Sequence, residues 1–186
     1  MFSTNISLSS PIQTYIVPII ISLLISFPCL AEENSQFHLD ATQNIVYCDI
    51  TPSFNQNDVI QRLNDGTEVF FYWHIEVESI QNYWLNQQVA DIHFTRQVLP
   101  DLLTQQWQLH DSLTDIPTHT HSLSQALAFL SQIKHFPIID KSLLSPHTAY
   151  LITVSLNIEE GKQNHTWWNA ILHTEHTIAS SILNLP

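Results

Sequence analysis

The sequence predicts an α+β fold, with an antiparallel sheet of about five or six strands and two short helices. The main observation is that apolar and polar residues alternate along most of the chain beyond residue 35, which is the pattern of strands with one buried face. The second is that only two segments show the three-and-four spacing of an amphipathic helix. Strands interrupted by isolated helices are typical of the α+β class.

Six segments show the alternation expected of strands: residues 36–41, 44–50, 67–79, 88–99, 103–109 and 150–158. In residues 67–79 one face is apolar and the other mixes acidic and aromatic side chains, so we expect a strand that is buried on one side only. The apolar face holds Val69, Phe71, Trp73, Ile75 and Val77, and the opposite face holds Glu68, Phe70, Tyr72, His74, Glu76 and Glu78.

The two predicted helices span residues 56–64 and 123–133. The first has Asn55 or Asn57 as its N-cap, and Asp65-Gly66 ends it. In the second, Ser122 and Gln125 form a capping box, and His135-Phe136-Pro137 ends the helix. The tail, residues 169–183, fits either a short amphipathic helix or a docking strand.

Residues 1–31 have the pattern of an export signal. The apolar stretch from Tyr15 to Leu30 carries no charge, and Cys29-Leu30-Ala31 favours cleavage before Glu32. The alternatives are an uncleaved inner-membrane anchor, a buried core helix, or a lipoprotein attached through Cys29. We therefore predict a periplasmic protein with a single domain, residues 32–186, which contacts a membrane only through the leader if the leader is retained.

The charge and cysteine content narrow the partners and the compartment. The formal net charge is −12, with only five lysines and arginines, so we expect no binding to nucleic acid. After cleavage Cys48 is the only cysteine, and no internal disulfide is possible. Its apolar neighbours Val46 and Ile50 indicate a small buried residue rather than a reactive thiol.

Several catalytic motifs are excluded by the glycine content. Gly66 and Gly161 are the only glycines, so the sequence contains no P-loop, no dinucleotide fingerprint and no Gly-x-Ser-x-Gly elbow. Glu76 and Glu78 share a strand face, but a solvated face explains them. We assign no catalytic residue and no cofactor, and we predict a protein that is not an enzyme.

Histidine is the one functional residue type in excess. His119 and His121 flank one residue, and His173 and His176 are three residues apart, which are spacings compatible with zinc or copper ligation if the two pairs meet in space. Solvated or hydrogen-bonded histidines are the alternative. Tyr83 and Trp84 connect two predicted strands and are candidates for an interaction surface, or for a cover over the core edge.

The order of these segments resembles a bacterial family of exported proteins called domain of unknown function 4390. The likeness covers roughly residues 36–168 and lies in Leu63-Asn-Asp-Gly66, Val69-Phe-Phe-Tyr-Trp73, Tyr83-Trp84, Leu103-Thr-Gln-Gln-Trp107, Ser122-Leu-Ser-Gln-Ala-Leu127 and the strand from Tyr150. Members of this family have no assigned activity, so the resemblance implies none for this chain. Their genes often neighbour that of a membrane sensor kinase, which implies a link to such a kinase. Where family members usually carry arginines around the Tyr-Trp segment, this chain has Gln81 and Asn82.

Two functional hypotheses follow. The first is a non-enzymatic accessory module that binds a protein partner at the bacterial envelope, through an acidic sheet face or through Tyr83 and Trp84. The second is a periplasmic metal-binding protein that holds zinc or copper with His119, His121, His173 and His176. An enzyme is a third alternative, for which the sequence supplies no catalytic constellation.

Overall fold

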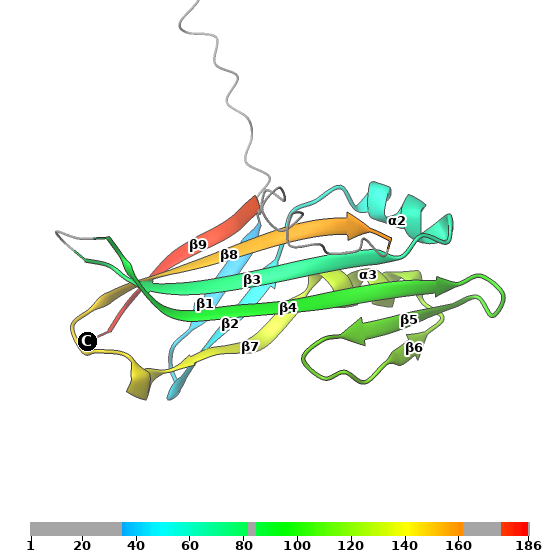
Figure 1. The fold of residues 1–186 in the computed structure, drawn as a ribbon. Helices are drawn as coiled ribbons and strands as arrows, with labels where there is room; N and C mark the ends of the chain where they lie inside the picture. The colour runs from blue at the N-terminus through cyan, green and yellow to red at the C-terminus, as the bar shows by residue number, and fades with distance from the viewer. Residues whose placement is uncertain (1–34, 82–84, 162–175, 186) are drawn as a thin grey trace, which may run out of the picture. The chain divides into compact units, whose positions relative to one another are not determined.

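The computed structural model describes residues 35–81, 85–161 and 176–185, all within one compact unit, Glu33–Pro186. These residues form nine strands in two antiparallel sheets, two α-helices and one short 3-10 helix, Lys141–Leu143 (Figure 1). The predicted α+β class is confirmed, and the strands outnumber the five or six expected. None of the helices in these ranges is long and apolar enough to cross a membrane.

The larger sheet has six strands in the order β6-β5-β4-β3-β8-β9. Its central strand β3 pairs along its whole length with β4 and β8. Thr118–Thr120 at one edge and His176–Asn184 at the other are the two outermost strands. The bounds are β3 Val69–Ser79, β4 Gln87–Asp101, β5 Gln106–Asp111, β6 Thr118–Thr120, β8 Ala149–Glu160 and β9 His176–Asn184.

Two of these strands refine the sequence predictions. The strand predicted over residues 103–109 begins at Gln106, because the Asp101 carboxylate accepts hydrogen bonds from the amides of Leu103 and Thr104 and folds this segment into a turn. Of the two alternatives for the tail, residues 176–184 adopt the strand.

The smaller sheet has three strands in the order β1-β2-β7, with bounds β1 Gln36–Asp40, β2 Ile45–Thr51 and β7 Ile133–Asp140. The pair β1 and β2 was predicted, whereas β7 was not. The segment read as a helix end is a strand with a bulge at His135, whose backbone φ is 49°. The Asp49 carboxylate holds this bulge by accepting a hydrogen bond from the His135 amide at 2.6 Å.

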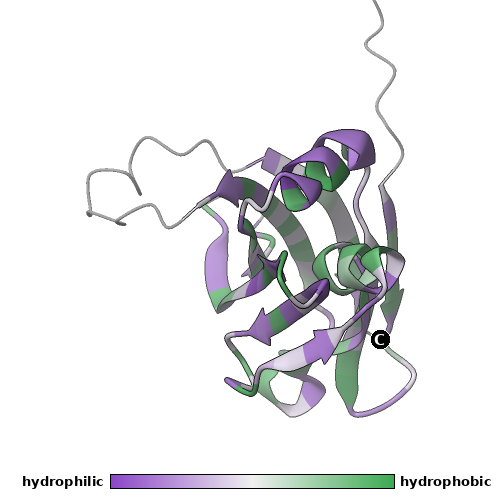
Figure 2. Cartoon of the chain, turned by 90° about the vertical axis from the view of Figure 1, so that its right-hand side faces the viewer, coloured by the Kyte–Doolittle hydropathy of each residue, from purple (hydrophilic) through white to green (hydrophobic). Residues whose placement is uncertain are grey.

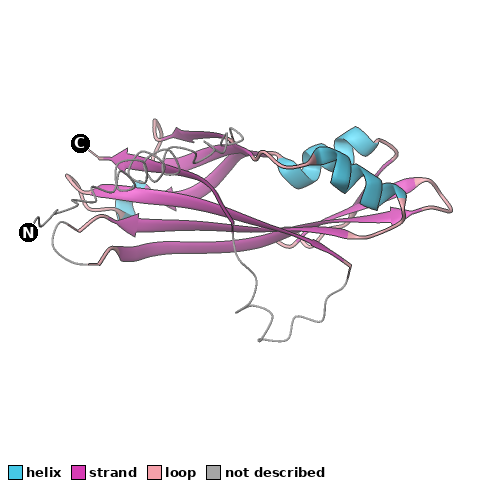
Figure 3. Cartoon of the chain, turned by 90° about the horizontal axis from the view of Figure 1, so that it is seen from above, coloured by secondary structure: helices cyan, strands magenta, loops and turns pink. Residues whose placement is uncertain are grey.

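Both predicted helices are present, and both lie at the same end of the sheets (Figures 1 and 3). In α2, Gln56–Asn64, the side chain of Asn55 accepts a hydrogen bond from the Asp58 amide, and Gly66 follows the helix end with a φ of 81° that favours glycine. In α3, Leu123–Ser131, Ser122 Oγ accepts a hydrogen bond from the Gln125 amide. The helix ends two residues earlier than predicted because Gln132 is already extended.

The core lies between the two sheets and the helices. The alternate residues Val69, Phe71, Trp73, Ile75 and Val77 of β3 are at most 1% exposed, and they form one cluster with the buried residues of β2, β7, α2 and α3. In Figure 2 green apolar residues accordingly alternate with purple polar ones along the strands. Cys48 lies in this core as predicted, and burial raises the pKa of its thiol to about 12.

The opposite side of the six-stranded sheet, which we call the outer face, carries the other half of β3. Tyr72, His74 and Glu76 alternate with the core residues and are partly exposed. Directly beside them on β4 lie Thr95, His93 and Asp91. The candidate site is formed by side chains on this face.

Candidate functional site: a histidine-aspartate-histidine cluster

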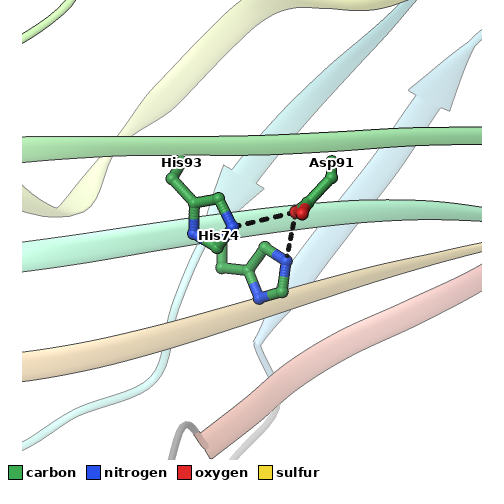
Figure 4. A group of neighbouring side chains, drawn as sticks. All are labelled: His74, Asp91 and His93. Atoms are coloured by element: carbon green, nitrogen blue, oxygen red, sulfur yellow. Dashed lines mark hydrogen bonds and ion pairs between the residues drawn. The ribbon is translucent and has the colours of Figure 1, made fainter. Parts of the chain in front are cut away.

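Three side chains converge on the outer face: His74 from β3, and Asp91 and His93 from β4 (Figure 4). The strand register brings them together, because His74 lies directly opposite His93 and Asp91 is two residues before His93 on the same face. One potential ligand atom from each residue lies within 4.8 Å of the others.

Both histidines contact one carboxylate oxygen. His74 Nε2 lies 2.8 Å from Asp91 Oδ1, and His93 Nε2 lies 2.9 Å from the same oxygen. The two imidazole rings are stacked, with centroids 4.0 Å apart and planes 14° from parallel. The two ring nitrogens and the carboxylate oxygen therefore point at one place on the sheet surface (Figure 4).

The electrostatics keep Asp91 ionised. Burial acts to raise the pKa of the Asp91 carboxyl, but the hydrogen bond from His74 and the nearby charges of His93 and His74 outweigh it, so this pKa lies below its ordinary value. Glu76 lies directly opposite Asp91 and adds a second carboxylate. Among the described residues, β3, β4 and β8 place no lysine or arginine on the outer face, so this face attracts cations.

The donor set is that of a transition-metal site. Two imidazole nitrogens and one carboxylate oxygen are ligands that zinc, copper and related divalent ions accept. Around a tetrahedral zinc ion with bonds of about 2.0 to 2.1 Å, neighbouring ligand atoms lie about 3.3 Å apart. The contacts of 2.8 and 2.9 Å need to open by about half an ångström to admit the ion, which side-chain rotation provides.

The site is open rather than enclosed. The side chains of His74, Asp91 and His93 are 20%, 44% and 59% exposed, and three cavities elsewhere on the described part of the chain are lined by other residues. A metal ion held by these three side chains would be accessible from solvent.

The described histidines that were predicted from sequence spacing lie at opposite edges of the six-stranded sheet. His119 is in β6 and His121 just follows it, whereas His176 begins β9, and these strands are the two opposite edges of the six-stranded sheet. His121 Nδ1 lies 3.3 Å from the carbonyl oxygen of Gln105. His173 lies outside the described residues, as do the interaction candidates Tyr83 and Trp84.

Sequence reasoning missed the cluster because its signal is weak. His74 was recognised on the polar face of its strand, but Asp91 and His93, separated by one residue on the next strand, were not singled out. An Asp-x-His sequence on a strand places both side chains on one face. Only the register between β3 and β4 shows that His74 is their neighbour.

The fold and the site define a two-sheet α+β domain with an open histidine and carboxylate cluster on its larger sheet. The chain belongs to the family described as a domain of unknown function (DUF4390), whose family model matches residues 32–163, and the resemblance noted in the sequence is thereby confirmed. Neither the curated proteins nor the solved structures contain a match to this chain.

Proposed function

We propose that this protein is an exported, non-enzymatic module that binds a divalent transition-metal ion through His74, Asp91 and His93. The observation that carries the proposal is the convergence of two imidazole nitrogens on one carboxylate oxygen, at 2.8 and 2.9 Å. A fixed carboxylate between two histidines orients their Nε2 atoms before an ion arrives, which lowers the cost of forming the site.

Zinc and copper are the ions that this donor set favours. Mixed nitrogen and oxygen ligands suit both, and magnesium or calcium would prefer a site built from oxygen alone. Three protein ligands leave at least one position on the ion for water or for a further group. Because the ligands are solvent-accessible, the ion exchanges with its surroundings, which suits a carrier, a buffer or a sensor of metal.

Export is the second part of the proposal. An uncharged apolar segment runs from Tyr15 to Leu30, and Cys29-Leu30-Ala31 provides a cleavage signal before Glu32. The family match begins at residue 32, directly after this predicted leader, which supports a separation between leader and domain. Fractionation of cells, followed by amino-terminal sequencing of the periplasmic product, tests this part. Recovery of the full-length chain from the cytosol would contradict it.

Metal titration tests the site. We expect calorimetry with zinc or copper to show one site per chain with a dissociation constant clearly tighter than about 0.1 mM, the weak range of isolated surface histidines. His93→Gln and Asp91→Asn each remove one ligand, and we expect each to weaken binding at least tenfold. His93 is 59% exposed, so its substitution leaves the fold intact.

The chain offers matched controls. His119→Gln and His121→Gln remove a histidine pair with ligand-like spacing elsewhere in the sequence, and we expect both variants to bind the ion as the native protein does. If these substitutions weaken binding while His93→Gln does not, the ion is held by the other histidines and the proposed site is wrong.

A further inference from the structure

We propose that a cavity at the helical end of the domain binds a neutral sugar, with the ring of Trp107 as its platform. The cavity has a volume of about 630 Å³, within the range of about 300 to 1,000 Å³ that is typical of small-molecule sites. None of the three residues of the metal cluster lines it. The inference therefore stands independently of the proposed metal site.

The cavity is formed by segments that are distant in the sequence. Asn64 ends α2, His121 and Leu123 lie at the start of α3, and residues 101–107 except Leu103 supply the turn between β4 and β5 and the first residues of β5. Both helices lie at this end of the sheets (Figures 1 and 3). The cavity therefore exists only in the complete fold.

The turn at the rim of the cavity is fixed before a ligand arrives. The Asp101 carboxylate accepts hydrogen bonds from the amides of Leu103 and Thr104 at 3.0 and 3.3 Å. It accepts a third from Thr104 Oγ1 at 2.7 Å. The carbonyl oxygen of Gln105 lies 3.3 Å from His121 Nδ1, which connects the turn to the start of α3. A rim that is already ordered lowers the entropic cost of binding.

Trp107 and Leu123 form the apolar floor of the cavity. Trp107 is two residues before the buried Leu109 on β5, so both side chains lie on the core side of the sheet. Trp107 and Leu123 pack against the core but are only partly buried, and both line the cavity. The face of an aromatic ring is partly negative and attracts the C–H groups on the flat side of a sugar ring.

The polar lining suits hydroxyl groups. Asn64 and Gln105 each carry an amide, which has two donor hydrogens and an acceptor oxygen. Thr104 adds a hydroxyl oxygen that can accept, and His121 adds a second ring nitrogen. Sugar hydroxyls both donate and accept, so they match a mixed set of this kind. An apolar floor with polar groups around it is the usual composition of a small-molecule site.

The charge around the cavity favours a ligand without charge. Among the described residues that line it there is no lysine or arginine, and the formal net charge of the chain is −12, so anions are repelled. A cation would need a carboxylate free to pair with it. The Asp101 carboxylate, however, already accepts three hydrogen bonds within its own turn.

Calorimetry on the full chain in the presence of a metal chelator tests the inference. The probes are the disaccharides maltose, cellobiose and chitobiose, with choline as the cationic and glucose 6-phosphate as the anionic comparison. We expect at least one disaccharide to bind at one site per chain with a dissociation constant of about 1 mM or tighter, and neither charged probe to do so. If no disaccharide binds that tightly, or if a charged probe binds more tightly than all three, the inference is wrong.

Two substitutions within the cavity locate the sugar. Trp107→Leu keeps an apolar contact with the core but removes the flat ring, and should weaken binding about tenfold or more. Gln105→Gly removes an amide at a position whose φ of 54° favours glycine, so the fold is retained. It should weaken binding about threefold or more. If Trp107→Leu does not fold, as judged by its urea midpoint, Gln105→Gly decides.

Helix α2 provides a matched pair of asparagines. Asn64 and Asn57 are both exposed, but Asn57 lines a different cavity, also of about 630 Å³, near the start of the helix. Asn64→Ala should weaken sugar binding about threefold or more, and Asn57→Ala should leave it unchanged. If Asn57→Ala has the larger effect, or if Gln105→Gly and Asn64→Ala both bind as the native chain does, the sugar binds elsewhere and the inference is wrong.

Discussion

At the residue scale, Trp73 places a polar group without a hydrogen-bond partner in the core. Its side chain is 1% exposed at the centre of β3, stacked against Phe94 with ring centroids 6.1 Å apart. Within the described residues its Nε1 has no hydrogen-bond partner. A buried donor without a partner costs about 1 to 3 kcal/mol of stability. The indole thus contributes packing at the expense of an unsatisfied polar group.

We therefore expect Trp73→Phe to change the free energy of unfolding by less than about 1 kcal/mol, because removing the unpaired donor offsets the loss of the larger ring. Trp73→Ala removes the ring altogether and should cost about 3 to 5 kcal/mol. Urea unfolding measures both. If Trp73→Phe lowers the free energy of unfolding as much as Trp73→Ala does, the indole N–H contributes a hydrogen bond and the prediction is wrong.

At the element scale, Arg96 ties helix α3 to the large sheet. Its Nη1 donates to the carbonyls of Phe129 and Gln132 at 2.8 and 2.7 Å, at the carboxyl end of the helix, where a positive charge is favourable. Its Nε donates to Asp111 Oδ2 at 3.1 Å, and both side chains are less than one-fifth exposed. One guanidinium therefore joins β4, β5 and α3.

We expect Arg96→Met to lower the free energy of unfolding by about 3 kcal/mol or more, because it leaves the Asp111 carboxylate buried without its partner. Adding Asp111→Asn should recover part of the loss, since the second substitution removes the unpaired charge. Urea unfolding of the two single variants and the double variant measures the coupling. A purely additive result would contradict the role of the pair.

Three turns depend on ionised aspartates. The carboxylates of Asp40, Asp101 and Asp140 accept hydrogen bonds from Thr42, Thr104 and Ser142 of their own turns, and these bonds lower the pKa of each carboxyl. A carboxyl with a lowered pKa binds fewer protons in the folded state than in the unfolded state. It therefore stabilises the fold above its ordinary pKa, and this contribution is lost as pH falls through the folded value.

We expect the urea midpoint of the native protein to fall as pH drops from about 5 to about 2, and to fall less in the triple variant Asp40→Asn, Asp101→Asn, Asp140→Asn. Asparagine keeps an acceptor oxygen for the turn but carries no charge. Equal slopes for the two proteins would show that other carboxyls control the acid response.

The elements that sequence predicted well are those set by local chemistry. Helix α2 begins after Asn55 and is followed by Gly66 as expected, because capping residues act within a few positions of the helix end. Strand β7 was missed because its bulge at His135 and its Pro137 resemble a helix end. Its pairing with β2 depends on residues more than eighty positions away, which no local pattern contains.

At the scale of the whole molecule, the candidate site depends on sheet order and strand register rather than on local sequence pattern. His119 lies in β6 and His176 begins β9, and the sheet order that separates these strands is a property of the complete fold. The cluster that does converge is assembled by register, since His74 is seventeen residues before Asp91 in the chain. The histidines with ligand-like sequence spacing, His119, His121, His173 and His176, include none of the residues of this cluster.

The place of β3 between β4 and β8 has a consequence for how the chain is made. Its partner β4 follows at once, but β8 begins only at Ala149, so the middle of the large sheet stays incomplete until most of the polypeptide has been synthesised. Distant pairings of this kind form slowly. One side of β3 therefore has no strand to pair with in a nascent chain until β8 has been made.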